Sequence, residues 1–249
     1  MIYVCIPTHN EGPTVGLLLW KIRKVFEEFP REYQFLVGDD ASTDGTAEVL
    51  EPYQKVLPLT VIRSDTRQGY ARTVERLLRL ALERTDRPKR DAAILMHADF
   101  AHGPEFIPEL VRRLESGADL VVTEATLLGE ADRATRLVRR WAPMLLRRAI
   151  RIPGVRDITS GFMAFRLSTL RQTFRHPAGT LLQTDDWAAN AELLGRAAVH
   201  ARQIETVATV ERSDRRPRTS RSEPWARARD LWRAGAALRR LDLGEATHS

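Results

Sequence analysis

The chain has 249 residues, of which 43% are hydrophobic and 29% charged, a balance that is typical of a globular protein and excludes an intrinsically disordered one. Its formal net charge of +6 favours anionic partners such as nucleotide diphosphates, lipid phosphates or nucleic acid. The single cysteine, Cys5, excludes a disulfide framework within the chain and favours a reducing compartment. We expect one domain and a tail at this length.

The sequence also predicts how the protein relates to a membrane. The first residues, Met1–Asn10, lack the basic segment and the long apolar core of a secretory signal peptide. No stretch approaches the roughly 18 to 20 apolar residues that a membrane-spanning helix needs. We therefore expect a protein that can lie on a membrane surface without crossing the bilayer.

Short apolar runs alternate with helical periodicity in the first half of the chain, which predicts βα units around a mostly parallel sheet. The predicted strands are Ile2–Ile6, Gln34–Val37, Leu59–Arg63, Ala92–Met96 and Asp119–Thr123. Apolar residues at helical spacing predict helices over Val15–Phe29, over Ala71–Ala81 after Gly69, and over Phe106–Leu114. Ligands of such sheets bind beyond the carboxyl ends of the strands, where the strongly polar clusters of this sequence lie.

Two segments of the second half are rich in arginine. Arg133–Ile152 carries arginines among apolar residues and is interrupted at Pro143, a composition typical of a helix on a membrane surface. The alternative is a helix packed on the domain with its arginines in solvent. From Glu211 onward arginine dominates again, and we expect a loop near Pro217–Glu223, a terminal helix and a frayed end.

Two polar clusters, Pro7–Glu11 and Val37–Thr46, directly follow predicted strands. The adjacent carboxylates of Asp39 and Asp40 repel each other, and they are retained most easily where a ligand, a cation or a hydrogen-bond donor compensates them. Asp39 can accept a hydrogen bond from a nucleotide base, and Glu11 can accept from ribose hydroxyls.

Ser42, Thr43 and Asp44 of the second cluster have a simpler interpretation. Short polar side chains are favoured at helix N-caps, and the segment Ala47–Leu50 follows directly. We expect these three residues to cap a helix.

A third polar cluster, Met96–Glu105, contains His97 and Asp99, which alternate at the end of a predicted strand and can therefore point to the same side. An imidazole and a carboxylate can hold Mn²⁺ or a similar divalent cation against a diphosphate. The alternative is a buried, hydrogen-bonded His97 without a metal.

Together the clusters resemble glycosyltransferase family 2, and in particular its dolichyl-phosphate mannose synthase branch. Ile6–Glu11 is similar to the family's Pro-x-Tyr-Asn-Glu, and Asp39–Thr46 to its Asp-Asp-x-Ser-x-Asp-Gly-Thr. Gln68–Val74 occupies the place of its glycine-initiated helix, and Ile94–Leu114 that of its Asp-x-Asp segment and the following Pro-Glu helix. Several motifs in the right order are more specific than any single one.

The resemblance continues to about residue 221. Asp157–Arg166 is similar to the family's acceptor-side segment, and Asp214–Arg221 resembles its late Asp-Arg-x-x-Gly-x-Ser-Lys loop. The resemblance implies an α/β fold of the A-type (GT-A), a Rossmann-like nucleotide-diphospho-sugar transferase fold with a mostly parallel mixed sheet flanked by helices. The implied divisions are a catalytic domain at 1–210, with a nucleotide-sugar half at 1–125 and an acceptor half at 126–210, and a basic loop and C-terminal helix or tail at 211–249.

The resemblance also implies roles for individual residues. The nucleotide sugar would be bound by Pro7, Asn10, Glu11, Asp39, Asp40, Gln68, Ala98 and Asp99. The phosphates or the acceptor phosphate would be approached by Arg166, Arg212, Arg215, Ser220 and Arg221. A divalent cation, Mn²⁺ or Mg²⁺, would be held by His97 and Asp99.

Three departures from the family pattern change these expectations. His97 stands where the family usually has the first aspartate of its metal pair, and Ala101 where the mannose synthases have a glutamine. We therefore expect a weaker or more Mn²⁺-like cation site, because an imidazole must be neutral to coordinate. Arg218 replaces the glycine of the late loop, so Arg212 competes with Arg215 for the role of the loop arginine.

The chemistry depends on the acceptor. Departure of the diphosphate requires that its charge be neutralised, for which we expect Asp99 and His97 with a cation, helped by Arg215 or Arg221. The resemblance implies inversion at the anomeric carbon.

A phosphate acceptor is already ionised near neutral pH and needs no general base, whereas a hydroxyl acceptor does. Asp185 and Asp186 are the candidate bases, and their alternative role is the acidic N-terminus of a helix.

The sequence thus predicts an inverting glycosyltransferase that moves mannose or another hexose from a GDP- or UDP-linked donor to a polyprenyl or dolichyl phosphate, in the cytoplasm or at the inner face of the membrane. The alternatives are a soluble hydroxyl acceptor and a non-catalytic sugar-nucleotide-binding protein. Nucleic acid is not an expected partner, since zinc-finger spacing and RNP-like aromatic motifs are lacking. Neither a Gly-x-Gly-x-x-Gly after the first strand nor a P-loop is present, which argues against a dehydrogenase or a P-loop NTPase.

Overall fold

The computed structural model describes residues 1–100, 102–128, 150, 152–175 and 180–212. Within these residues, seven strands form one sheet in the order β3-β2-β1-β4-β6-β5-β7. The strands are β1 (Ile2–Thr8), β2 (Tyr33–Asp40), β3 (Leu59–Ser64), β4 (Ala92–Leu95), β5 (Leu120–Leu128), β6 (Met163–Arg166) and β7 (Ile204–Arg212). The helices are α1 (Gly12–Glu28), α2 (Thr46–Val56), α3 (Tyr70–Arg84), η1 (Pro104–Phe106), α4 (Ile107–Glu115), α6 (Leu167–Thr173) and α7 (Asp186–Ala198).

The sheet is mixed and mostly parallel, as the sequence predicted. β1 pairs in parallel with β2 and β4, and β2 pairs in parallel with β3. β6 lies antiparallel between β4 and β5, and β5 pairs in parallel with β7. The first four strands of the chain therefore lie side by side, whereas β6 lies between β4 and β5, which both precede it in the sequence.

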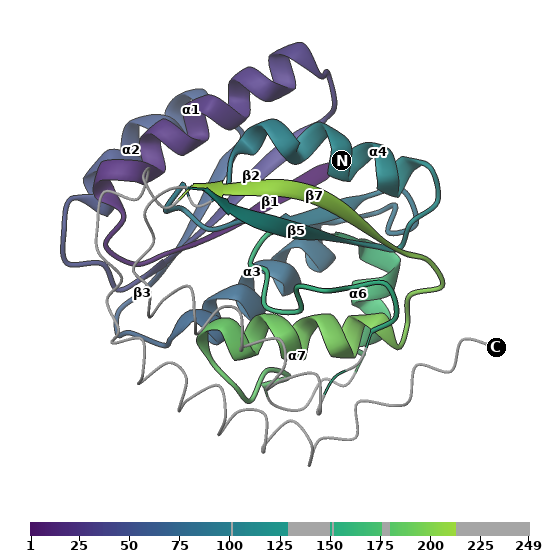
Figure 1. The fold of residues 1–249 in the computed structure, drawn as a ribbon. Helices are drawn as coiled ribbons and strands as arrows, with labels where there is room; N and C mark the ends of the chain where they lie inside the picture. The colour runs from purple at the N-terminus through teal and green to yellow at the C-terminus, as the bar shows by residue number, and fades with distance from the viewer. Residues whose placement is uncertain (101, 129–149, 151, 176–179, 213–249) are drawn as a thin grey trace.

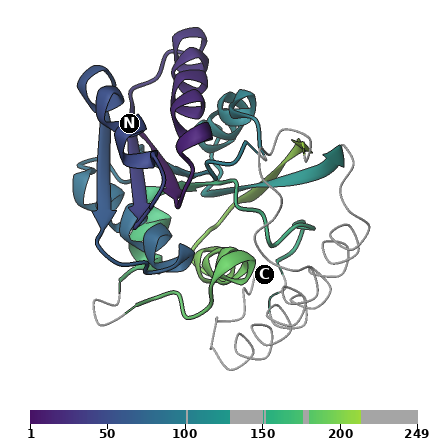
Figure 2. The ribbon, with the colours of Figure 1, turned by 90° about the vertical axis from the view of Figure 1, so that its left-hand side faces the viewer.

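Helices cover both faces of this sheet. Figure 1 shows α1, α2 and α4 on one face and α3, α6 and α7 on the other, and Figure 2 shows the same layers after a quarter turn. Side chains of a strand alternate between the two faces, so each face has its own apolar core. In β1, Ile2, Val4 and Ile6 pack into the core beneath α1 and α4, while Tyr3 and Cys5 pack into the core beneath α3 and α7.

The helices follow the predicted apolar periodicity. In α1, Val15, Leu18, Leu19 and Ile22 are fully buried, and each such side chain contributes roughly 1.5 to 3 kcal/mol relative to exposure. α3 begins directly after Gly69, whose φ of 96° lies in the left-handed region that favours glycine.

The prediction that Ser42, Thr43 and Asp44 form the N-cap before Ala47–Leu50 was wrong. The N-cap of α2 is Gly45, which makes no side-chain capping hydrogen bond. Asp44 comes closest to the predicted role, because its Oδ1 accepts from the Thr46 backbone nitrogen at 3.0 Å. These polar side chains are used mainly to join two neighbouring loops.

The strand register defines two edges of the sheet. At the carboxyl edge, where the parallel strands end, Thr8 pairs with Asp39 and Asp39 pairs with Arg63. At the amino edge, where these strands begin, Ile2 pairs with Ala92. The loops after β1, β2 and β4 therefore leave the sheet on the same side, as expected for a ligand site in this type of sheet.

Candidate active site

The loops after β1 and β2 hold each other in place at the carboxyl edge. The Asn10 side-chain oxygen accepts from the backbone nitrogens of Thr43 at 2.7 Å and Asp44 at 3.3 Å. In return, Ser42 Oγ accepts from the Asn10 backbone nitrogen at 2.8 Å, and Asp44 Oδ2 accepts from that of Gly12 at 3.2 Å. Asn10 has a φ of 56°, a conformation that asparagine tolerates better than most residues. Asn10 thus fixes the loop geometry of the site.

The adjacent carboxylates of Asp39 and Asp40 have different partners. Asp40 is 4% exposed, and its two oxygens accept from the backbone nitrogens of Gln68 at 2.6 Å and Gly69 at 2.9 Å. Asp40 therefore ties the end of β2 to the start of α3. The Gln68 side chain is exposed and donates to Thr66.

Asp39 is 1% exposed, and only one of its carboxylate oxygens has a hydrogen-bond donor in the described part of the chain. Oδ1 accepts from the Ser42 backbone nitrogen at 3.0 Å, whereas Oδ2 has no hydrogen-bond partner there and lies 3.4 Å from Nε of the exposed Arg63. A buried acceptor without a donor costs about 1 to 3 kcal/mol, or more for a charged group. This oxygen is therefore suited to accept a hydrogen bond from a bound ligand.

Pro7 and Glu11 lie beside this position. Pro7 is buried in β1, where it pairs with Gly38. Glu11 is half-buried and precedes α1, and its Oε2 accepts from Thr14 Oγ1 at 2.9 Å. The carboxylate thus lies at the start of a helix, next to the loops that Asn10 joins.

The loop after β4 brings His97 and Asp99 to the same edge, both half-buried, with buried Ala98 between them. The His97 ring stacks on the ring of Tyr70, with centroids 5.0 Å apart and an interplanar angle of 8°. Burial raises the pKa of the Tyr70 hydroxyl, and the nearby carboxylate of Asp186 raises this pKa further. The carboxylates of Asp99 and Asp185 act on that pKa in the same direction.

Asp185 and Asp186 begin α7. Asp185 is the N-cap, and its Oδ1 accepts from the backbone nitrogens of Asp186 and Ala71, both at 2.9 Å. Because Ala71 lies in the first turn of α3, this carboxylate joins the N-termini of two helices. Asp186 is exposed and has a φ of 54°. Asp185 and Asp186 thus form the acidic N-terminus of a helix, which was the alternative role given to them. Their role as a general base stays a prediction.

Two buried glutamates that the sequence analysis did not assign to the site hold the segment before α7. Glu75 is 4% exposed and accepts from the backbone nitrogens of Leu181 and Leu182, while Glu192 is 0% exposed and accepts from those of Gln183 and Thr184. Glu75 could have been noticed from the sequence, because it lies four residues after Ala71 and three before Leu78 on the buried face of α3.

These features agree with what comparisons with known proteins show. The family model described as "Glycosyl transferase family 2" matches residues 3–174. The chain belongs to glycosyl transferase family 2. An undecaprenyl-phosphate mannosyltransferase of Micrococcus luteus is 31% identical over 174 residues, which cover 68% of each chain. A dolichol-phosphate mannosyltransferase of Pyrococcus furiosus is 29% identical over 185 residues, 72% of this chain but only 49% of that protein, so this chain spans about half of the archaeal relative.

Solved structures confirm the GT-A fold expected of this family. Glucosyl-3-phosphoglycerate synthase of Mycobacterium tuberculosis has a TM-score of 0.66 at 20% identity, covering 97% of this chain and 81% of that one. TarS of S. aureus with UDP has a TM-score of 0.60 at 18% identity, covering 98% of this chain and 67% of that one. A further structure of the mycobacterial enzyme contains Mn²⁺, UDP-glucose and phosphoglyceric acid.

The structure of this family 2 chain corrects the prediction that Arg166 binds phosphate. Arg166 ends β6 and pairs with Ala92 at the amino edge, far along the strands from the loop of His97 and Asp99. Its guanidinium bonds Asp119 at 3.1 Å and donates to the carbonyls of Lys89, Leu114 and Ala118. Because β6 runs antiparallel to β4, Arg166 at the end of the Asp157–Arg166 motif lies at the amino edge of the sheet, and not at the carboxyl edge.

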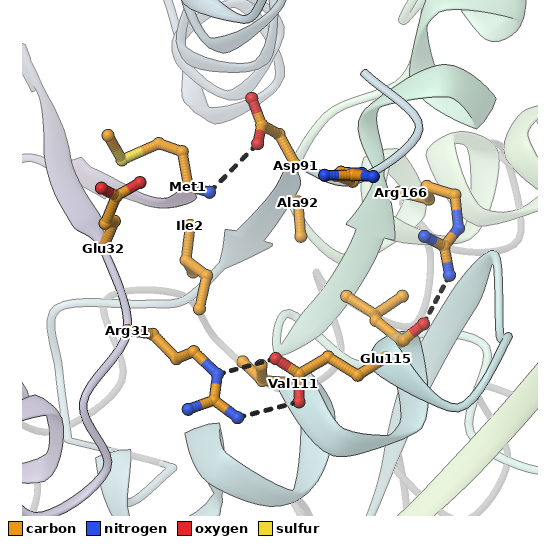
Figure 3. Close-up of a pocket in the computed structure, with 11 residues that line it drawn as sticks. Met1, Ile2, Arg31, Glu32, Asp91, Ala92, Val111, Glu115 and Arg166 are labelled. Atoms are coloured by element: carbon orange, nitrogen blue, oxygen red, sulfur yellow. Dashed lines mark hydrogen bonds and ion pairs between the residues drawn. The ribbon is translucent and has the colours of Figure 1, made fainter. Parts of the chain in front are cut away.

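Arg166 instead lines a pocket of about 240 Å³ at the amino edge, drawn in Figure 3. Charged side chains around this pocket pair with each other, as Arg31 does with Glu115 at 2.7 Å. The N-terminal amine lies 3.0 Å from Asp91. The pocket is therefore separate from the candidate active site.

Other predicted positions lie outside the described residues. These are Ala101, most of the segment Arg133–Ile152, and the tail residues Arg215, Ser220 and Arg221. Arg212 ends β7, but its side chain is not among those described.

The described residues provide only part of a divalent-cation site. Among them, no group of three or more His, Cys, Asp or Glu side chains converges on one point. Asp99 offers a half-buried carboxylate at the carboxyl edge, which fits a hard divalent cation.

Proposed function

We propose that the chain is an inverting glycosyltransferase that transfers a hexose, such as mannose, from a nucleotide diphosphate sugar to a polyprenyl phosphate. Membership in glycosyl transferase family 2 supports the reaction class. The lipid acceptor is supported by two relatives that are named as dolichol-phosphate and undecaprenyl-phosphate mannosyltransferases. The observation that carries the proposal is the buried Asp39 oxygen that lacks a donor within the described residues, at the edge where Asp99 also lies.

The nucleoside would bind where β1 and β2 end. Asp39 Oδ2 would accept from an N–H of the base, which would give this buried oxygen the donor that it lacks in the described structure. Glu11, placed at the start of α1 beside the joined loops, would accept from the ribose hydroxyls. Asn10 and Asp40 would act indirectly, because their side chains hold the loops that form the subsite.

The diphosphate would lie near Asp99. The carboxylates of Asp99, Asp185 and Asp186 all raise the pKa of the Tyr70 hydroxyl, and their negative charge would repel a diphosphate unless positive charge were added. A bound Mn²⁺ or Mg²⁺ would neutralise the leaving group. The Mn²⁺ and UDP-glucose in the solved mycobacterial enzyme of the same fold support this expectation, and Arg215 and Arg221 are further candidates.

A phosphate acceptor would not require Asp185 or Asp186 to act as a general base. An acceptor phosphate is largely dianionic at neutral pH, so its oxygen can attack the anomeric carbon without a general base while the bond to the diphosphate breaks. Asp185 already accepts two backbone hydrogen bonds with one oxygen, which suits a structural role better than proton transfer. Asp186 is the base that we would test if the acceptor proved to be a hydroxyl.

The proposed acceptor places the reaction at a membrane surface. In the described part of the chain no helix has the length and apolar character to cross a bilayer. We propose that the protein works at the cytoplasmic face and that the arginine-rich segments Arg133–Ile152 and 211–249 contact anionic lipid.

The test is a product analysis. Purified protein would be incubated with Mn²⁺, a short polyprenyl phosphate and, in turn, GDP-, UDP- and TDP-linked hexoses, and products would be identified by mass spectrometry. We expect one glycolipid from one donor, formed roughly 10²- to 10³-fold more slowly by the Asp99→Asn variant. Hydrolysis or binding of a donor without glycolipid formation would overturn the lipid acceptor, and soluble alcohols would then be tried with Asp186→Asn as the diagnostic variant.

A further inference from the structure

Residues 181–184 belong to no helix or strand, yet carboxylates accept hydrogen bonds from all four of their backbone nitrogens. Glu75 in α3 accepts from the first two nitrogens, at 2.9 and 3.2 Å. Glu192 in α7 accepts from the last two, both at 2.9 Å. The two helices lie on the same face of the sheet (Figure 1), so side chains of two neighbouring helices hold one short segment.

Each of these glutamates is paired with the arginine four residues later in its own helix. Two nitrogens of Arg79 donate to Oε1 of Glu75 at 2.9 and 2.7 Å, and two of Arg196 donate to Oε1 of Glu192 at 3.0 and 2.8 Å. The Oε2 atom of each glutamate accepts from two backbone nitrogens. The arginine compensates the buried charge, and the charged acceptor makes a stronger hydrogen bond than a neutral one. Each pair therefore clamps two residues of the segment 181–184.

The clamped segment leads directly to the carboxyl edge of the sheet. Asp185 follows it, and its Oδ1 accepts from the backbone nitrogen of Ala71 in the first turn of α3. This helix begins after Gly69, whose backbone nitrogen donates to Asp40 at the end of β2. Asp186 comes next and is exposed, with a φ of 54°, which is strained for a residue other than glycine. Such a conformation persists where the neighbouring residues are fixed.

We propose that Glu75 and Glu192 are positioning residues, which hold residues 181–184 rigid and thereby fix Asp186 at the carboxyl edge, on the acceptor side of the site. The backbone nitrogens of the segment already donate to the glutamates, so the segment supplies shape rather than hydrogen-bond donors to an acceptor phosphate. Glu192 holds the half that adjoins Asp185, so it has the larger effect of the two. The acceptor part of this inference rests on the proposed function.

The first test measures how firmly the segment is held and needs neither a variant nor a reaction. Amide hydrogen exchange of residues 181–184 would be followed by nuclear magnetic resonance in the wild type without ligands. We expect exchange at least about 100-fold slower than in an unstructured peptide, because each amide donates to a buried carboxylate. Exchange at close to the unstructured rate would overturn the proposal.

Two variants then separate the two clamps. Glutamine has the size of glutamate but only one acceptor oxygen, so either the arginine or the two backbone nitrogens lose their acceptor. Glu75→Gln should accelerate exchange at 181–182 about tenfold or more, and Glu192→Gln should do so at 183–184. Glu83→Gln, at an exposed glutamate of α3, is the matched control and should change neither pair. Equal acceleration at all four positions in both variants would contradict the assignment of one clamp to each half.

Turnover distinguishes a positioning role from a purely structural one. Glu192→Gln should lower kcat/KM for the polyprenyl phosphate about tenfold, and Glu75→Gln by less, because a small displacement near the reacting groups is costly. The Kd for the nucleoside diphosphate should stay within about twofold of wild type. Equal losses in both quantities, or an unchanged kcat/KM in Glu192→Gln, would overturn the positioning role. If the wild type formed no glycolipid, the proposed function would fail, while hydrogen exchange would still decide whether the glutamates hold the segment.

Discussion

The two edges of the sheet both gather charged side chains, but they compensate the charges differently. At the amino edge, oppositely charged side chains pair with each other. Arg166 is 18% exposed and binds Asp119, which is 6% exposed, and Arg31 binds Glu115 with two hydrogen bonds. Such charges are already neutralised within the protein, so this edge has little need of a ligand.

At the carboxyl edge, carboxylates accept mainly from backbone nitrogens. Asp40 and Asp185 each accept two such hydrogen bonds and thereby shape the loops. Asp39 keeps one buried oxygen without a hydrogen-bond donor among the described residues. The comparison shows that the nature of the partner, rather than the density of charge, separates a candidate ligand site from a structural ion-pair cluster.

The largest expected effect follows from removing the charge of Asp99. Loss of one electrostatic contact to the reacting groups costs roughly 10²- to 10³-fold in turnover, and we expect a loss of this size for Asp99→Asn with the melting temperature unchanged. The measurement is kcat with the donor that the product analysis identifies. Asp86→Asn, at an aspartate that is 80% exposed, is the control and should retain full activity. Comparable activity of the two variants would remove Asp99 from the site.

The opposite result is expected at the amino edge. Arg166→Met leaves Asp119 partly unpaired and removes several hydrogen bonds to carbonyls, which should destabilise the fold by about 2 to 3 kcal/mol. Urea unfolding measures this loss, while nucleotide affinity should stay within twofold of wild type. The exposed Arg87→Met is the control for stability. A selective loss of donor binding in Arg166→Met would restore the phosphate-binding role that the sequence predicted.

Asp39→Asn should weaken nucleotide binding with little effect on stability. Hydrogen bonds to charged groups contribute about 1.5 to 3 kcal/mol, so we expect roughly a tenfold or greater rise in the nucleoside diphosphate Kd. Isothermal titration calorimetry with GDP and UDP checks this, and the exposed Asp65→Asn is the matched variant. Unchanged affinity for the accepted nucleotide would place the base elsewhere.

The smallest effect is expected for Glu115, the exposed ion-pair partner of Arg31 at the amino edge. The hydrogen bond from Arg31 lowers the pKa of Glu115 below its ordinary 4.5. The associated stabilisation is therefore present above about pH 4.5 and disappears as the pH falls through the lowered pKa. Glu115→Gln should lower the urea midpoint slightly at pH 7 and by less at pH 3; both effects should be small, because exposed pairs contribute little. An equal difference at both pH values would contradict the ion-pair origin.

The sequence predicted the fold because apolar periodicity is a local signal. Leu18 and Ile22 repeat at helical spacing, and Val4 alternates within a short apolar run, so α1 and β1 could be located without knowledge of the rest of the chain. The loops after β1 and β2 were predicted to form a ligand site for a similar reason, and this stays a prediction. Parallel strands end at the same edge, whatever lies between them.

Hydrogen bonds between residues far apart in the sequence could not be predicted from local periodicity. The link from Asp40 to Gly69 spans 29 positions and that from Asp185 to Ala71 spans 114, so neither could be read from local pattern. Arg166 was misplaced because the direction of β6 depends on which strands it lies between. A parallel β6 would have ended at the carboxyl edge, whereas the observed antiparallel strand ends beside Ala92.

The place of β6 also has a consequence for synthesis on the ribosome. β5 is made before β6 but lies beyond it in the sheet, so β5 has neither β6 nor β7 to pair with when it emerges. Its edge is a template for wrong pairing until residues 163–166 arrive and fill the gap next to β4. The speed of translation between β5 and β6 should therefore influence how much of the newly made chain reaches the native state.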